Sequence, residues 1–298
     1  MRLVVTGASG QLGWELARSL APLGEVVALT RGELDLARLD TIGPKLRELQ
    51  PDVIVNAAAY TAVDQAEGDE ALASRINGEA VGIMADEAAR AGALLIHYST
   101  DYVFDGQKTA SYTETDAVAP LNAYGRSKLQ GELAIQNSSA AWMIFRTTWV
   151  YGARGQNFLR TIWRLAGERE TLRIVADQRG APTGARLIAE ISAHAIRAAQ
   201  IERRNGKFVP GLYHLSADGE TTWHGFATAI VEQLRELAPN DFVKTTSIEA
   251  IASKDYPVPA RRPNNSLLDN SKLTDRFDLH RPDWRQTLTT TLQDALAR

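Results

Sequence analysis

Apolar residues along the first half of the chain follow two alternating patterns. Short continuous runs, each bounded by glycine, proline or polar residues, have the length and composition of buried β-strands. Between them lie stretches in which apolar residues recur every three or four positions, as they do on one face of a helix. The runs predict strands at 3–5, 25–29, 53–55, 94–97 and 142–146, and the periodic stretches predict helices at 11–20, 44–50, 71–91 and from about 124.

This alternation of strands and helices is typical of a parallel sheet with a helix in each crossover. The strands are apolar throughout rather than at every second position, which indicates that helices cover both faces of the sheet. We therefore expect an α/β fold of the Rossmann type, with a doubly wound parallel sheet.

Beyond residue 148 the pattern is less regular. It predicts helices at 158–166, 187–199 and 284–297, strands at 172–175 and 212–215, and irregular structure at 257–263, where there are three prolines. No linker or repeat separates the two halves. We expect residues 1–148 to form a dinucleotide-binding domain to which later segments return, and residues 149–298 to form mainly a substrate-binding region that is interleaved with it.

The composition excludes several classes of protein. The chain has 298 residues and a net charge of -3, which argues against a nucleic-acid partner and against a basic membrane-binding surface. We find no stretch of about eighteen apolar residues and no signal-peptide pattern near Met1, so a cytoplasmic protein is expected. The chain contains no cysteine, and its five histidines have no metal-ligand spacing, so we expect no metal site built from these residues.

Three glycines mark the first turn as a candidate phosphate site. Gly7, Gly10 and Gly13 follow the first strand and open the first helix. Glycines allow a tight turn and a close approach of the backbone to a pyrophosphate, which the N-terminus of the helix then attracts. The alternative is a plain strand–helix turn, but the flanking strand and helix favour dinucleotide binding.

The end of the second strand bears on the choice of cofactor. Thr30 and Arg31 stand where an acidic residue would bind the ribose 2′-hydroxyl of NAD, whereas an arginine can bind the 2′-phosphate of NADP. NADPH is therefore the expected cofactor, and use of NADH as well is compatible with the pattern. The alternative for Arg31 is an ordinary solvated side chain.

Three further residues form a candidate catalytic group. Tyr124 and Lys128 are four positions apart on a predicted helix and so share one face. Thr100 comes just after the fourth strand, at the edge of the sheet where open α/β folds bind ligands. A phenol beside an ammonium group can transfer a proton near neutral pH, a hydroxyl can polarise a carbonyl, and the ammonium can also reach the nicotinamide ribose.

With these residues the sequence resembles the dTDP-4-dehydrorhamnose reductase family, a branch of the extended short-chain dehydrogenases. The resemblance covers nearly the whole chain. Besides the glycine turn it rests on DVIVNAAAYTAVD at 52–64, STDYVFDG at 99–106, YGRSK at 124–128, RTTWVY at 146–151, DQRGAPT at 177–183 and ARRP at 260–263. It implies reduction of dTDP-4-dehydro-L-rhamnose to dTDP-L-rhamnose, the last step of dTDP-rhamnose biosynthesis.

The resemblance also implies roles for individual residues. In the cofactor site it implies pyrophosphate contacts at Gly10, Gln11 and Leu12, ribose and adenine contacts at Thr30, Asp35 and Leu36, and nicotinamide contacts at Ala59, Tyr60 and Thr61. In the substrate site it implies sugar contacts at Thr100 and Asp101, a proton donor at Tyr124, a cofactor-binding Lys128 and a nucleotide-sugar contact at Trp149. We further expect Gln178 and one of Arg261 and Arg262, preferably Arg262, to face the same cleft, where the arginine would bind the diphosphate.

One departure from the family pattern concerns magnesium. Some members bind Mg²⁺ through clustered glutamates at a dimer interface, and Glu15 is present here. Arg186, however, stands where another of these glutamates is expected. Mg²⁺ dependence is therefore uncertain, and both a monomer and a homodimer stay open.

Other functions are compatible with parts of the pattern. A 4,6-dehydratase typically has Asp-Glu after the threonine, whereas Asp101 is followed here by Tyr102. A 4-epimerase would keep its NAD bound through turnover. A non-catalytic NADP-binding regulatory subunit would bind a larger protein, although the intact Thr100, Tyr124 and Lys128 favour an enzyme.

Overall fold

The computed structural model describes residues 1–238 and 242–297, so 239–241 and 298, which belong to the expected substrate-binding region, lie outside the described residues. Six strands form one sheet in the order β10-β5-β4-β3-β1-β2, and all neighbouring pairs are parallel. Their bounds are Arg2–Thr6 (β1), Glu25–Leu29 (β2), Val53–Asn56 (β3), Leu94–Thr100 (β4), Ala141–Thr147 (β5) and Gly211–His214 (β10). The predicted doubly wound parallel sheet is confirmed.

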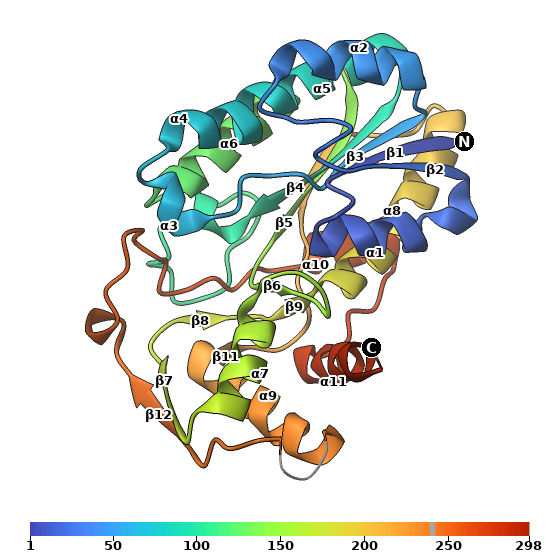
Figure 1. Ribbon diagram of the computed structural model, residues 1–298. Helices are drawn as coiled ribbons and strands as arrows, with labels where there is room; N and C mark the ends of the chain where they lie inside the picture. The colour runs from blue at the N-terminus through green and yellow to red at the C-terminus, as the bar shows by residue number, and fades with distance from the viewer. Residues whose placement is uncertain (239–241, 298) are drawn as a thin grey trace.

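Helices cover both faces of this sheet (Figure 1). One layer consists of α2 (Leu39–Leu49), α5 (Ala80–Ala91) and α6 (Ala123–Gln136), and the other of α1 (Gln11–Ser19) and α8 (Ala185–Arg204). Successive strand residues alternate between the two cores, as the pleat requires. Thus Val4 packs into the core with α2, whereas Leu3 and Val5 pack into the core with α1 and α8.

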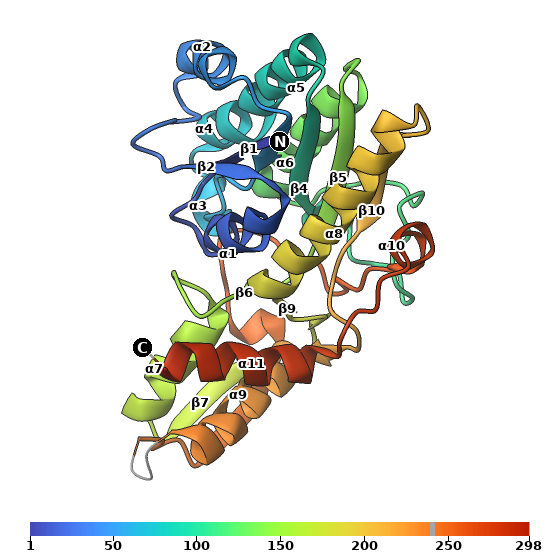
Figure 2. The ribbon, with the colours of Figure 1, turned by 90° about the vertical axis from the view of Figure 1, so that its right-hand side faces the viewer.

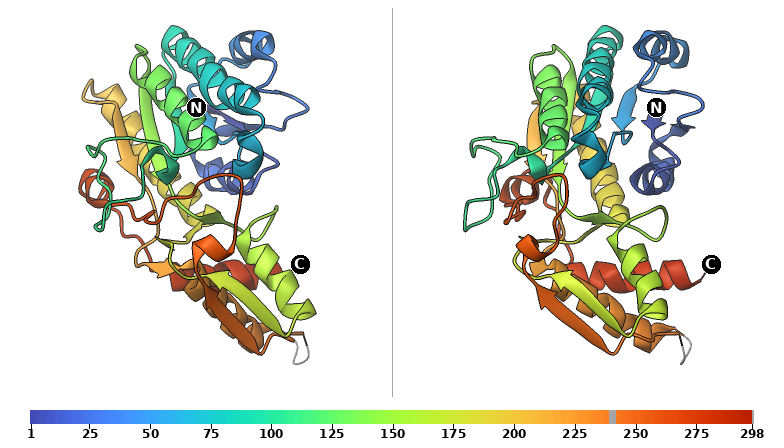
Figure 3. Two further views of the ribbon diagram at one scale, coloured as in Figure 1. Left: turned by 90° about the vertical axis from the view of Figure 1, so that its left-hand side faces the viewer. Right: turned by 60° about the vertical axis from the view of Figure 1, so that its left-hand side comes forward.

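Several elements that follow β5 in the chain form a second lobe below the carboxyl ends of the strands (Figures 1 and 2). Its helices are α7 (Phe158–Glu168), α9 (Trp223–Leu237) and α11 (Trp284–Leu296). Its paired strands are β6 (Val150–Tyr151) with β9 (Thr183–Gly184), β7 (Thr171–Val175) with β12 (Ser247–Ile251), and β8 (Arg179–Gly180) with β11 (Thr221–Thr222). Both views of Figure 3 show the chain crossing repeatedly between the two lobes.

Several boundaries differ from the sequence prediction. The predicted helix at 71–91 is α4 (Glu70–Ser74), a π-helical turn (Arg75–Glu79) and α5 in succession. Helix α2 begins at Leu39 and contains Pro44, whereas the sequence analysis placed only the end of a helix at 44–50. The sequence analysis did not predict α9, β12, α3 (Val63–Ala66), α10 (Ser271–Phe277) or the 3₁₀ turns Asp101–Val103 and Ser253–Asp255. No helix in the described parts of the chain is long and apolar enough to cross a membrane.

Candidate active site

A cavity of about 650 Å³ lies at the carboxyl ends of β1 to β5. Strand order reverses there between β1 and β3, which is where doubly wound sheets bind ligands. Most of the predicted site residues line it: Gly7, Gly10, Gln11, Leu12, Arg31, Asp35, Leu36, Ala59, Thr61, Thr100, Asp101, Tyr124, Lys128 and Trp149. The other predicted residues lie around the cavity rather than in its wall: Gly13, Thr30, Tyr60, Gln178 and Arg262.

The glycine turn at the end of β1 is shaped for an anion. Gly7 has a φ of 69°, and a Cβ on Gly13 would lie 2.1 Å from the Gly7 carbonyl oxygen, so a side chain at Gly13 is excluded. Helix α1 begins at Gln11 with no side-chain cap and no acidic residue in its first turn. Its first backbone N–H groups are therefore available to a pyrophosphate, which the positive end of the helix dipole also attracts.

The end of the cavity beside β2 carries both signs of charge. Arg31 lies 3.5 Å from Asp35 (Nε to Oδ1), and 76% of its side chain is exposed. Thr30 does not line the cavity, because its hydroxyl donates to Glu33 Oε2 at 2.9 Å. A 2′-phosphate at Arg31 would thus compete with Asp35 for the guanidinium.

Tyr124 lies at the start of α6, where Asn122 caps the helix by accepting the Gly125 N–H at 2.8 Å. Burial and the neighbouring Asp101 raise the pKa of Tyr124, and the nearby Thr100 hydroxyl opposes that rise. At neutral pH the phenol is therefore protonated and can act as an acid. The sequence analysis expected the Lys128 ammonium to favour the phenolate, whereas burial is the largest influence in the structure.

Lys128 is directed into the interior beside β4. Its Nζ lies 2.7 Å from the Tyr98 carbonyl oxygen and 3.1 Å from His97 Nε2. Burial lowers the pKa of Lys128 to about 8, and the Glu132 carboxylate opposes this shift. Lys128 lines the same cavity as Tyr124, one helical turn away on α6.

Four buried polar atoms of the cavity wall have no hydrogen-bond partner among the described residues. They are Ser99 Oγ, Asp101 Oδ2, Thr147 Oγ1 and Thr148 Oγ1. Buried polar atoms in native proteins are nearly always hydrogen-bonded, so this wall suits a ligand that is rich in hydroxyl or carbonyl groups. Burial raises the pKa of Asp101 to about 6, although the hydroxyls of Ser266, Thr100 and Thr148 oppose the rise.

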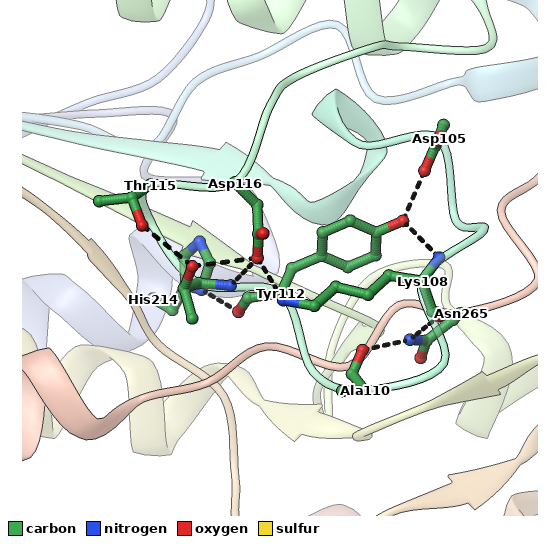
Figure 4. A network of polar contacts seen from close by, with 9 residues as sticks. Asp105, Lys108, Ala110, Tyr112, Thr115, Asp116, His214 and Asn265 are labelled. Atoms are coloured by element: carbon green, nitrogen blue, oxygen red, sulfur yellow. Dashed lines mark hydrogen bonds and ion pairs between the residues drawn. The ribbon is translucent and has the colours of Figure 1, made fainter.

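A polar network joins the segment that carries Ser266 to the loop after β4 (Figure 4). Asn265 Nδ2 donates to the carbonyl oxygens of Lys108 and Ala110 at 2.8 and 2.9 Å. Tyr112 donates its hydroxyl to Asp105 at 2.6 Å, and its carbonyl oxygen lies 2.9 Å from His214 Nδ1. The loop after β4 and the segment at 263–269 are thereby fixed together behind Asp101.

Trp149 forms the wall of the cavity on the side of the second lobe. Its φ of 44° is unusual for a residue with a side chain, and its ring stacks on Trp223 with centroids 3.6 Å apart. Gln178 accepts the Trp223 indole N–H at 3.1 Å and donates to Ser253 Oγ at 2.9 Å. Gln178 therefore supports the two stacked rings from behind.

Two other predicted residues also lie behind the wall. Arg262 donates to Asp64 Oδ2 at 3.0 Å, and it is more enclosed than the exposed Arg261. The backbone of Tyr60 is held by Asn77, and its ring packs beside Tyr124 on a small alanine cluster.

The predicted departure from the magnesium pattern has a structural counterpart. Arg186 forms ion pairs with Glu190 at 2.9 Å and with Asp294 at 3.2 Å. Within residues 1–238 and 242–297, no group of three or more histidine or acidic side chains is arranged to hold a metal ion.

Sequence reasoning missed several residues around the site, among them Asn56, His97, Trp223 and Ser266. Asn56 and Trp223 line the cavity, His97 contacts Lys128, and Ser266 lies beside Asp101. A signal was present for Asn56 and His97, since each is a polar residue at the end of an otherwise apolar strand. Trp223 and Ser266 come from the second half of the chain, where the apolar pattern is irregular and predicted no helix or strand at these positions.

The chain is similar to known proteins over nearly its whole length. Residues 1–297 match the family model of the RmlD substrate binding domain. A dTDP-4-dehydrorhamnose reductase of Burkholderia thailandensis is 54% identical over 298 residues, which covers 100% of both chains. A dTDP-4-dehydrorhamnose reductase of Bacillus anthracis, solved in complex with NADP, has a TM-score of 0.86 and 32% identity, covering 98% of this chain and 99% of that one. The corresponding structure from Clostridium acetobutylicum has a TM-score of 0.88 and 31% identity, with 100% of both chains covered.

Proposed function

Because this chain belongs to the family of the RmlD substrate binding domain, together with dTDP-4-dehydrorhamnose reductases, we propose that it reduces dTDP-4-dehydro-L-rhamnose to dTDP-L-rhamnose with NADPH. The chain is an NAD(P)-dependent oxidoreductase, and the proposed reaction is the last step of dTDP-rhamnose biosynthesis. The observation that carries the proposal is the placing of Thr100, Tyr124 and Lys128 around one cavity at the switch point of the sheet.

The residues at the carboxyl ends of β1, β2 and β3 fit a dinucleotide. The uncapped start of α1 and the close approach of Gly13 to Gly7 leave room and donors for a pyrophosphate. Arg31 would bind the 2′-phosphate of NADPH, and its pairing with Asp35 leaves NADH usable as a second cofactor. When bound, NADPH supplies the hydride. Ala59 and Thr61 would lie beside its nicotinamide.

Reduction of a ketone requires a proton for the oxygen that becomes an alcohol. Tyr124 would donate that proton, because its phenol is protonated at neutral pH and faces the cavity. Thr100 would donate a hydrogen bond to the ketone oxygen and polarise it. Lys128 would hold the nicotinamide ribose through its ammonium group.

The nucleotide sugar would occupy the part of the cavity nearest the second lobe. The unpartnered Asp101 Oδ2 and the neighbouring buried hydroxyls would bind the sugar, and Trp149 would cover it. Gln178 would act through Trp223, and Arg262 would turn from Asp64 to the diphosphate. On this proposal residues 1–148 bind mainly the cofactor and 149–298 mainly the substrate, and the cytoplasm stays the proposed location.

The test is loss of NADPH absorbance when dTDP-4-dehydro-L-rhamnose is added to the pure protein, with chromatography of the product. We expect one dTDP-L-rhamnose for each NADPH consumed. Interconversion of two 4-hydroxy nucleotide sugars without net NADPH loss, and no reduction of the 4-keto sugar, would indicate a 4-epimerase instead. Tight NADPH binding with no turnover of any 4-keto nucleotide sugar would favour the regulatory subunit, and stable co-purification with a larger protein would support that outcome.

A further inference from the structure

A row of polar side chains crosses three adjacent strands directly beneath the cavity. Thr6, Asn56 and His97 are register neighbours on β1, β3 and β4, and each is buried. Thr6 Oγ1 donates to Asn56 Oδ1 at 2.7 Å, and Asn56 Nδ2 lies 3.1 Å from His97 Nδ1. His97 Nε2 lies in turn 3.1 Å from Lys128 Nζ. The row therefore ends on the lysine of the proposed catalytic group.

The hydrogen bonds around Asn56 determine which ring nitrogen of His97 carries the proton. Asn56 Oδ1 accepts from the Thr6 hydroxyl and from the Ala58 backbone N–H, so its Nδ2 is the atom that faces His97. An amide NH₂ group can only donate, so His97 Nδ1 must accept. A neutral imidazole then carries its single proton on Nε2. Burial keeps the ring neutral, because it lowers the pKa of His97 well below its ordinary value.

This tautomer has a consequence for Lys128. An ammonium group has three donors and no acceptor, so Lys128 Nζ as an ammonium would place a donor against the His97 Nε2–H. As a neutral amine, Nζ can accept from Nε2–H while it donates to the Tyr98 carbonyl oxygen, and both observed distances are then hydrogen bonds.

The other groups around Lys128 do not provide a strong counter-charge. Glu132, one turn further along α6, is a carboxylate that favours the ammonium. Both of its oxygens, however, accept from Arg146 on β5, at 2.9 and 2.6 Å, and this ion pair is buried. Tyr124, at the start of α6, is protonated and uncharged at neutral pH. The protonation state of Lys128 in the free protein thus depends on the polar row of β1, β3 and β4.

We propose that His97 is a positioning residue for Lys128: Asn56 holds it as the Nε2–H tautomer, which favours the neutral amine of Lys128 in the free protein, so that near pH 8 Lys128 takes up a proton when the cofactor ribose is bound. The ribose hydroxyls can accept hydrogen bonds from an ammonium group. His97 cannot accept one, because its Nε2 carries a proton. Only the second half of this inference rests on the proposed function.

The first test is nuclear magnetic resonance of the free protein labelled with ¹⁵N-histidine. Correlations between the ring protons and ring nitrogens distinguish the two neutral tautomers. We expect His97 to be the Nε2–H tautomer and not to titrate between pH 5.5 and 8. Its signal is assigned by its loss in His97→Gln, or, if that variant does not fold, by assigning the other four histidines in turn. The Nδ1–H tautomer in the wild-type protein would overturn the proposal, whatever the substrate of the enzyme.

The second test reverses the tautomer. In Asn56→Asp a carboxylate would accept from His97 Nδ1–H, so the Nε2 lone pair would face Lys128 and favour its ammonium. We expect the Nδ1–H tautomer in the free variant, and proton uptake on NADPH binding near pH 8 that is smaller than in the wild type. Calorimetry in buffers of different ionisation enthalpy measures that uptake. His280→Asn, an exposed loop substitution, is the matched control and should leave both readouts unchanged. Equal proton uptake in wild type and Asn56→Asp, with the tautomer reversed, would refute the link to Lys128.

Discussion

Replacing Tyr124 by phenylalanine separates proton donation from every other contribution of this side chain. The ring packs against a small alanine cluster and lies edge-on to Tyr102, with centroids 5.7 Å apart, and phenylalanine keeps both contacts. What disappears is the phenolic proton beside Thr100. General acid catalysis typically contributes about 10²–10⁴-fold, so kcat should fall by that factor at saturating NADPH and substrate. NADPH affinity should stay within about two-fold, because no cofactor contact of the ring is removed.

The stability of this variant can be matched by a control in the same protein. Tyr151 is buried in the second lobe, and its hydroxyl lies 3.0 Å from Thr287 Oγ1, away from the cavity. Each Tyr→Phe change removes one hydroxyl, and each should therefore cost about 0.5–1.5 kcal/mol in the free energy of unfolding. Only Tyr124→Phe should lose turnover. The assay is NADPH oxidation with purified dTDP-4-dehydro-L-rhamnose, alongside thermal unfolding. Turnover of Tyr124→Phe close to that of Tyr151→Phe would remove Tyr124 from the mechanism.

Three further substitutions test other parts of the site. Arg31→Ala should lower the NADPH/NADH preference by about five-fold at most, since the side chain is exposed and already paired with Asp35, and an unchanged ratio of Kd values would exclude a phosphate contact. Asp101→Asn should raise Tm at neutral pH, because burial raises the pKa of Asp101 to about 6 and the ionised carboxylate therefore destabilises the folded protein. The gain in Tm over the wild type should shrink as the pH falls below 6, and a gain that is constant from pH 5 to 8 would contradict this. Gln178→Leu should raise the KM for the nucleotide sugar several-fold with NADPH affinity unchanged, because Trp223 loses its hydrogen bond; equal loss of both affinities would indicate a folding defect instead.

The sequence predicted the sheet well because its strands are covered on both faces. Such strands are short, apolar and separated by helices, so their number and order along the chain can be read from hydrophobicity alone. Strand β4, predicted to end at His97, continues to Thr100, since the strand keeps its backbone pairing with β5 after its side chains become polar. Its polar end was therefore assigned to a turn.

The second lobe was less predictable for a physical reason. Its pairs β6–β9 and β8–β11 have two residues in each strand, which is too short for any period to be recognised. Trp223 begins a helix that buries one face against α7 and α11, yet the sequence analysis did not predict that helix. Contacts such as Trp149 on Trp223 join residues 74 positions apart, and only the tertiary fold determines them.

Polar residues in a buried strand cost stability unless they are fully hydrogen-bonded. The presence of a polar row at Thr6, Asn56 and His97 therefore requires an explanation. Each of the three positions faces the core that contains Val4, Ile54 and Leu95, so an apolar side chain would be the default there. The row is instead connected by hydrogen bonds from the first strand to Lys128. A purely structural role would be met as well by three apolar residues, whereas a defined imidazole tautomer beside the lysine requires this order of donors and acceptors. These three polar residues thus lie at the strand ends that meet the cavity. Functional sites are where residues are expected to depart from the apolar pattern that packing alone would favour.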